Sequence, residues 1–145
     1  MKRRIQGLHE AAQWADGVPD GLFLLRVERA QYHWHAQKPF YAMRLSVLEP
    51  SQFVGHIISG RLYCTAKALW KMSWFLRDFG YDTELIDRDE IDEKALVGLC
   101  GIVKISHTTH NGAILINLDG FAPACQWQEM STAASNKADG SEVVG

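Results

Sequence analysis

Aromatic and imidazole rings crowd one short stretch of this 145-residue sequence, QYHWHAQKPFY at positions 31–41, which reads as the tip of a β-hairpin and its stems. Hairpin tips are usually built from small polar residues. Exposed flat rings stack on nucleobases, and neighbouring cations follow the phosphates of a single nucleic-acid strand. The stretch therefore predicts a surface that binds a single strand without reading its sequence.

The ring and cation candidates for that surface come from several parts of the chain. The predicted stacking residues are Trp34, Phe40, Tyr63 and Tyr32, and the predicted phosphate contacts are Arg26, Lys38, Arg44, Arg61 and Lys104. Two assignments stay open. Tyr32 shares its strand parity with Ala30 and fits the core equally well. Gly60 marks a bend or bulge that would change the side to which Arg61 points.

Four histidines allow a different chemistry, because His33 and His35 share one strand face and His107 and His110 lie in a later loop. Imidazoles from two loops are a conceivable zinc or nickel site. No carboxylate or Cys-x-x-Cys accompanies them, and structural zinc sites usually show tighter spacing. Contact with nucleic acid, which we assign to His107, and plain exposure are the other interpretations. We predict no metal and no other cofactor.

Charge is distributed unevenly. Residues 1–77 carry 11 Lys and Arg against 5 Asp and Glu, and residues 78–145 carry 4 against 12, so net charges of +6 and −8 sum to the formal −2. A basic half can serve a polyanion even when the whole chain is nearly neutral. Much of the acid lies at 78–93, which we expect to be a solvated loop.

Catalytic motifs are missing from the sequence, which has no glycine-rich phosphate loop, nucleophile elbow or spaced His-Glu pair. We therefore predict a binding protein and not an enzyme. The sequence contains no run of about 18 apolar residues, so it predicts no membrane span. The odd number of cysteines, Cys64, Cys100 and Cys125, predicts reduced thiols in the cytoplasm.

Alternating and helical hydrophobic patterns predict five strands, one long helix and one or two further helical turns within 92–99. The strands lie at 21–35, 40–47, 56–64 and on either side of the Asn111-Gly112 turn within 101–121, and the helix lies at 65–80. The alternation of the first strand slips at Arg29–Ala30, where we expect a β-bulge. Thr65 is the predicted N-cap of the helix, and Gly80 the predicted residue after its C-terminus.

The helix combines a predicted buried stripe with an unusual opposite face. The stripe comprises Ala68, Leu69, Met72, Phe75, Leu76 and Phe79. Trp70 and Trp74 lie opposite it, one turn apart, where large apolar rings are hard to explain as solvent-exposed residues. Three interpretations stay open: packing under the N-terminal segment around Leu8 and Trp14, a subunit interface, or further DNA contacts. Self-association would suit the cooperative coating of a strand.

Three strands, a helix and two strands are the order of an OB-fold, a five-stranded Greek-key barrel that binds ligands on strands 2 and 3 and through its 1–2 and 4–5 loops. The stretch 31–41 then becomes the 1–2 loop and its stems, and SHTTHNG at 106–112 becomes the 4–5 loop. We predict a mainly β fold with an OB-fold domain over 18–124. A partly helical N-terminal extension over 1–17 and a disordered tail over 125–145 complete the chain.

A family resemblance accompanies these patterns. It is carried, in order, by VPDGLFLLRVERAQ, PFYAMRLSVLE, KALWKMSWFLRDFGYD, DEKALVGLCGIVKI and NGAILINLDGFAPA, across residues 18–124. The chain resembles the single-stranded-DNA-binding-like proteins of phages and related mobile elements, a family long catalogued only as a domain of unknown function. The resemblance implies an OB-fold that coats single-stranded DNA during replication or recombination, with replication or recombination proteins as partners.

The functional expectation is thus a cytoplasmic protein that binds single-stranded DNA and self-associates. RNA offers the same phosphates and stacking faces, so it stays open as a ligand. The alternative function is a protein-interaction or assembly module of the same fold that binds no nucleic acid and uses the Trp70 and Trp74 face for its partner.

Overall fold

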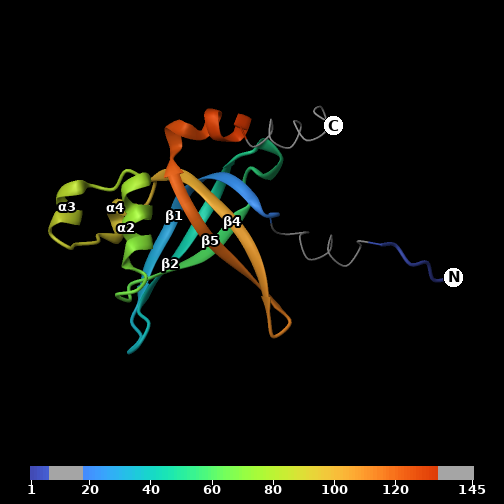
Figure 1. The fold of residues 1–145 in the computed structure, drawn as a ribbon, viewed down its shortest axis with the longest axis horizontal. Helices are drawn as coiled ribbons and strands as arrows, with labels where there is room; N and C mark the ends of the chain where they lie inside the picture. The colour runs from blue at the N-terminus through green and yellow to red at the C-terminus, as the bar shows by residue number, and fades with distance from the viewer. Residues whose placement is uncertain (7–17, 134–145) are drawn as a thin grey trace.

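Five antiparallel strands form one strongly curved sheet in the computed structural model, which describes residues 1–6 and 18–133 (Figure 1). The strands are β1 (Gly21–His33), β2 (Phe40–Glu49), β3 (Ile57–Tyr63), β4 (Cys100–His110) and β5 (Ala113–Pro123). Their order in the sheet is β3-β2-β1-β4-β5, so β3 and β5 are its edges. The predicted mainly β fold is confirmed, but in the described residues no β3–β5 pairing closes the sheet into a barrel.

The connection between β3 and β4 carries the helices α2 (Leu69–Asp78), α3 (Thr83–Asp87) and α4 (Glu93–Leu96), which lie together beside one end of the sheet (Figure 1). No helix among the described residues is long and apolar enough to cross a membrane.

The predicted start of the long helix is wrong, whereas its predicted end is confirmed. The Thr65 carbonyl accepts the N–H groups of Ala68 and Leu69 at 2.9 and 3.0 Å, so Thr65 opens a separate turn and Ala68 is the N-cap. At the other end Gly80 takes a φ of +80°, and the Tyr81 N–H donates to the Leu76 carbonyl at 2.9 Å. This left-handed glycine with its returning hydrogen bond is a Schellman motif, which stops α2.

Helix α3 corrects the prediction of a solvated loop over 78–93, whereas α4 lies within 92–99, where helical turns are predicted. The Asp82 side chain accepts the N–H of Glu84 at 2.9 Å and begins α3. Asp92 accepts the N–H of Lys94 at 3.0 Å and begins α4. Aspartate is a favoured N-cap because its carboxylate satisfies amide groups that the first helical turn leaves unpaired.

The C-terminal segment departs from the predicted disorder where it is described. Ala124–Gln126 forms a 3₁₀ turn, and residues 127–133 are α-helical. Residues 134–145 and the predicted helix around Leu8 and Trp14 lie outside the described part of the chain.

The predicted β-bulge in β1 is confirmed, with its extra residue one position earlier than expected. Val27 lies opposite Leu45 and Arg29 lies opposite Arg44, so Glu28 has no partner of its own on β2. An extra residue reverses the side to which the following side chains point. Beyond the bulge it is therefore the even-numbered positions, beginning with the buried Ala30, that continue the core side of the strand.

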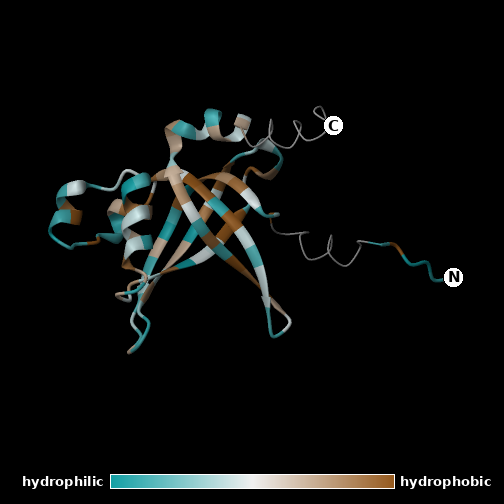
Figure 2. Cartoon of the chain, viewed as in Figure 1, coloured by the Kyte–Doolittle hydropathy of each residue, from teal (hydrophilic) through white to brown (hydrophobic). Residues whose placement is uncertain are grey.

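The core lies inside the curve of the sheet and is closed by α2. Figure 2 shows apolar residues concentrated where the strands cross. Phe75 of α2 and Phe79, its C-cap residue, pack against Phe121 of β5, with ring centroids 5.4 and 6.3 Å from that of Phe121. Leu69, predicted to belong to the buried stripe, is 49% exposed, because it lies over the cleft between α2 and α3.

The last turn of α2 approaches β4 at a glycine. A Cβ atom added at Gly101 would lie 2.5 Å from ring carbons of Phe79. Any larger residue at this position would therefore have to push the helix away from the strand.

Gly101→Ala should lower the free energy of unfolding by about 1–3 kcal/mol, because the methyl group meets a Phe79 ring that is held between Phe75 and Phe121. Urea denaturation would measure the loss. Phe79→Leu in the same background makes room, so the double variant should lose less than the two single losses added. Equal stability of the wild type and Gly101→Ala would contradict this packing.

Candidate nucleic-acid interface

A row of three rings crosses the outer face of β1, β2 and β3. The register pairs His33 with Phe40 and Phe40 with Tyr63, and directly opposed residues share one face of a sheet. The His33 and Phe40 rings are stacked, with centroids 5.0 Å apart and planes 11° apart, and the Tyr63 centroid lies 5.7 Å from that of Phe40. The row is continuous and is partly open to solvent.

Three arginines follow the ring row along the same face. Arg61 places its guanidinium carbon 4.4 Å from the Phe40 ring centroid, a cation–π geometry. One row further on, Arg29 lies opposite Arg44. Within the described part of the chain none of these three arginines forms an ion pair, so their charges are not neutralised by a carboxylate.

A hollow of about 250 Å³ lies between these arginines, where the small side chain of Ala42 leaves the sheet surface open. Its lining contains no Asp or Glu and consists of Arg29, Gln31, Ala42, Met43, Arg44, Ser59, Gly60 and Arg61. We call the ring row and this hollow together the ring–arginine face.

The direction of Arg61, left open by the sequence, is settled by the strand register. The β2–β3 pairing runs without a shift from Ser46 opposite Ile57 to Phe40 opposite Tyr63. Gly60 is therefore not a bulge, and Arg61 points outward with Tyr63.

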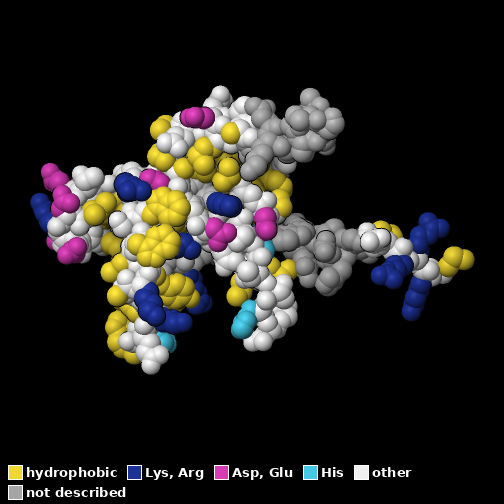
Figure 3. All heavy atoms as spheres, viewed as in Figure 1, with side chains coloured by type: hydrophobic (Ala, Val, Ile, Leu, Met, Phe, Trp, Pro, Cys, Tyr) yellow, Lys and Arg dark blue, Asp and Glu magenta, His cyan; other side chains and the backbone are white. Residues whose placement is uncertain are grey.

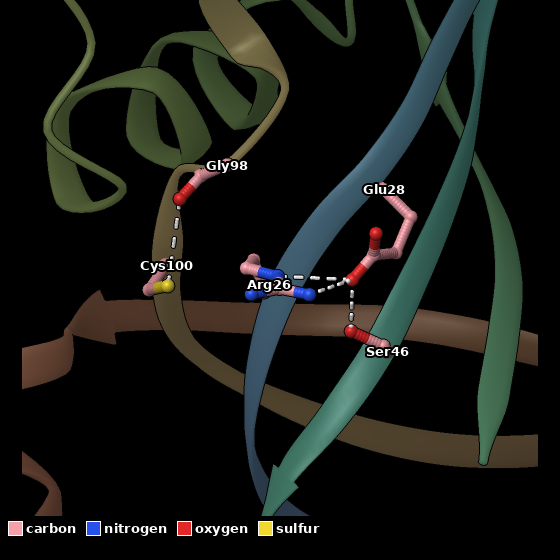
Figure 4. Close-up of polar contacts among 5 residues, drawn as sticks. All are labelled: Arg26, Glu28, Ser46, Gly98 and Cys100. Atoms are coloured by element: carbon pink, nitrogen blue, oxygen red, sulfur yellow. Dashed lines mark hydrogen bonds and ion pairs between the residues drawn. The ribbon is translucent and has the colours of Figure 1, made fainter. Parts of the chain in front are cut away.

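Arg26 does not join the ring–arginine face, because Glu28 holds it (Figure 4). The Nε and Nη2 groups of Arg26 donate to Glu28 Oε1 at 2.9 and 2.8 Å, and Ser46 Oγ donates to the same oxygen at 2.6 Å. The Ser46 hydrogen bond and then that of Arg26 lower the pKa of Glu28, and Glu28 raises the pKa of Arg26. The predicted phosphate contact is thus already occupied by a carboxylate.

Two further predicted contacts lie elsewhere. His107 has a side chain only 8% exposed, and its Nδ1 contacts the Asp20 carboxylate, so it is not presented to a ligand. Lys104 is exposed but lies on β4 opposite Gly120, where it borders an apolar hollow with Trp74. Both residues lie in or close to the predicted 4–5 loop, so the sequence alone could not show that they are outside the site.

The β1–β2 loop begins directly after the ring row. Trp34 directly follows His33 and is 76% exposed, and Lys38 is also exposed. His35 has a structural role, because its Nδ1 accepts the N–H groups of Gln37 and Lys38 at 3.2 Å each. The loop is therefore shaped by a histidine and presents a tryptophan beside the row.

Tyr32 faces the core side of the sheet, which settles the other open assignment. It lies opposite the buried Tyr41, with ring centroids 5.2 Å apart, and its backbone N–H donates to Glu93 Oε1 at 2.7 Å. Burial raises the pKa of Tyr41 to about 12. Tyr32 is 41% exposed, but it lies on the side of the sheet away from Phe40 and Tyr63.

Sequence reasoning missed Arg29 and Gln31, and it left His33 open between a metal ligand, a nucleic-acid contact and plain exposure without placing it in the predicted site. The signal was present in the slipped alternation of β1. Because Ala30 and Tyr32 share the core side, Arg29, Gln31 and His33 must point outward. They lie on the same face as Arg44 and Phe40.

The two tryptophans of α2 differ in environment. Trp74 is half-buried: its Nε1 donates to Asp78 Oδ2 at 2.8 Å, and its ring packs edge-on against Phe121 at 5.5 Å. Trp70 is 63% exposed and stacks on Trp74 at 6.1 Å. Figure 3 shows hydrophobic side chains gathered between α2 and the C-terminal helical segment. The segment around Leu8 and Trp14, one predicted cover for these tryptophans, lies outside the described residues.

No cluster suited to a metal is found in residues 1–6 and 18–133, where no three His, Cys, Asp or Glu residues are placed to hold one ion. His33 stacks on Phe40, and His107 contacts Asp20.

Comparisons with known proteins add no relative. The sequence matches no model of a known protein family, and no curated protein is significantly similar to it.

Glu28→Gln removes the carboxylate held by Ser46 and Arg26. A carboxyl group whose pKa falls on folding adds stability above its ordinary pKa of 4.5, and this contribution disappears as the pH falls through the lower folded-state value. Below about pH 4.5 the wild type should therefore lose stability more steeply than Glu28→Gln. Urea midpoints across this range measure it.

Glu49→Gln is the matched control, because Glu49 is exposed at the end of β2 and its carboxylate makes no hydrogen bond within the described residues. It should keep the wild-type pH dependence. Identical acid profiles for Glu28→Gln and the wild type would show that the network adds nothing.

Proposed function

We propose that this protein binds single-stranded DNA, largely without sequence preference, through the ring–arginine face of β1, β2 and β3. The observation that carries the proposal is the direct succession of a three-ring row and three arginines without an ion pair on one face. The combination of stacking surfaces and unpaired cations is the general requirement for binding single strands.

The rings supply affinity that does not depend on base identity. Every base has a flat face, and each base stacked on an aromatic side chain contributes about 1–3 kcal/mol. Phe40 is central in the row, and Trp34 follows His33 in the loop. Bases would therefore stack from the loop across the sheet.

The arginines supply the electrostatic part. Arg29, Arg44 and Arg61 follow the row at strand spacing, and phosphates on either side of the stacked bases would contact them. Each neutralised phosphate of a single strand releases counterions, so binding should weaken as salt rises.

The fold and setting are proposed on the same basis. The strand order along the chain, with helices between β3 and β4, supports an OB-fold Greek-key barrel whose β3–β5 seam is open. The sequence resemblance supports a role in phage or mobile-element replication or recombination, in the cytoplasm and without catalysis.

Phe40→Ala and Arg44→Ala should each weaken binding of a labelled oligo-dT of about 30 nucleotides, followed by fluorescence anisotropy across a salt series. Loss of stacking should reduce affinity about 5- to 150-fold for Phe40→Ala. Loss of one phosphate contact should lower the salt slope by about 0.7 for Arg44→Ala. Lys104→Ala removes an equal charge from another surface and should leave both values unchanged.

The competitors in this experiment are duplex DNA and poly-U. Preference for dT over duplex would support the single-strand function, and the poly-U result would decide between DNA and RNA. No binding of wild-type protein at low salt would reject the proposal.

A protein-interaction or assembly module is the second candidate, and Trp70 favours it. A tryptophan that is 63% exposed and stacked on Trp74 is the largest apolar side chain offered by α2. Tryptophan is enriched among the residues that dominate protein interfaces.

Trp70→Ala should abolish self-association if this face joins two copies, because the variant removes the exposed ring without disturbing the half-buried Trp74. Analytical ultracentrifugation without DNA measures it. Leu115→Ala, which removes an exposed apolar side chain from β5, is the control and should associate as the wild type does. A wild type that is monomeric at all concentrations would contradict the hypothesis that Trp70 joins two copies.

A further inference from the structure

The two open edges of the sheet, β3 and β5, flank a groove of about 670 Å³, which we call the edge groove. The start of α2 forms its third wall. The lining residues are Ser59, Gly60, Arg61 and Tyr63 of β3, Ala68 and Lys71 beside and in α2, and Ile114, Leu115, Ile116, Asn117 and Leu118 of β5. The β4–β5 turn at Asn111 and Gly112 takes no part in it.

A close approach of the two strands forms the floor of the edge groove. Leu118 is only 3% exposed, and a Cβ atom added at Gly60 would lie 2.8 Å from its Cδ1 atom. The strands therefore converge at Gly60 without pairing, and the groove has a closed base and an open mouth.

The charge of the edge groove is of one sign. Arg61 and Lys71 are its cations, and neither forms an ion pair within the described residues. Among the described residues, no Asp or Glu lines the edge groove or the hollow of the ring–arginine face. A surface that carries Arg and Lys side chains without neighbouring carboxylates favours a polyanion.

Apolar and aromatic groups complete the walls. Tyr63 is the last ring of the ring row, and Leu115 on the opposite wall is 47% exposed. Together they offer a flat and an apolar surface to a base that enters between them. The volume lies within the range of about 300–1,000 Å³ of pockets that hold small organic ligands, so a base and its sugar fit.

The edge groove is continuous with the ring–arginine face, because Ser59, Gly60 and Arg61 line both. We infer that a bound strand crosses the β3 edge at Arg61 and continues into the edge groove, where Lys71 contacts a phosphate and Tyr63 and Leu115 hold a base. This inference rests on the proposed function and extends it to residues of β5 and α2.

The crossing explains how single strands would be selected. A strand that leaves the outer face of the sheet and enters a groove at its edge must turn within one or two nucleotides. Duplex DNA has a persistence length of about 150 base pairs and cannot make that turn, whereas a single strand can. A duplex would reach only the outer face and lose every contact in the edge groove.

An added peptide strand is the other occupant that open sheet edges accept. The observations favour nucleic acid, because the groove shares Arg61 with the ring–arginine face and carries only positive charge. A peptide that merely paired with backbone groups would have no use for Lys71.

The test compares two oligo-dT lengths, about four and about twelve nucleotides, within the range of site sizes known for OB-folds. The short oligonucleotide fills the ring–arginine face, and the long one also reaches the edge groove. Lys71→Ala should reduce affinity for the long one about 3- to 10-fold, lower its salt slope by about 0.7 and leave the short one unchanged. Leu115→Ser should weaken only the long one, with the salt slope retained.

Lys67→Ala is the matched control, because Lys67 is exposed just before α2 and lines neither the edge groove nor the hollow. It should change neither length by more than about twofold. If Lys71→Ala and Leu115→Ser bind both lengths as the wild type does, the inference is overturned while the proposed function stands. If the wild type binds neither length, the proposed function fails and the inference fails with it.

Discussion

The extra residue in β1 is the constraint on which the rest of this sheet depends. Before Glu28 the strand pairs with both β2 and β4, and after it only with β2. Val27 marks the change, because its N–H and carbonyl pair with Leu99 and Gly98 at 2.8 Å each, in the segment that leads into β4. The reversal of side-chain direction at this point turns Arg29 outward. One inserted residue thus marks the point where β1 stops pairing with β4, and it directs Arg29 toward the ring–arginine face.

Helix α2 covers the core at the other end of the sheet. It reaches the sheet at residues that lack a side chain: Phe79 packs on Gly101, and the ring of Trp74 lies above Gly120. Aromatic rings bury large apolar areas and pack well edge-on, so a short helix suffices to close the curve. Phe75, Phe79 and Trp74 therefore stabilise the fold, whereas Phe40 and Tyr63 remain partly open at the surface.

Local patterns predicted the elements well, and contacts distant in sequence explain what they missed. Alternation identified the strands, and the left-handed backbone at Asn111 and Gly112 confirms the predicted hairpin turn. Composition could not show that Glu28 neutralises Arg26 or that Asp20 engages His107, because each depends on a partner brought near by folding. A side chain's type and parity say where it points, but its availability depends on its neighbours.

The contacts within the ring row have an entropic consequence. His33 stacks on Phe40, and Arg61 lies over the same ring. Contacts between side chains restrict the rotamers that they adopt, and long side chains such as arginine lose most freedom on ordering. If the ring–arginine face binds as proposed, these contacts reduce the ordering cost that usually offsets part of the binding free energy. The proposed face would then bind a flexible ligand with little change in its own shape.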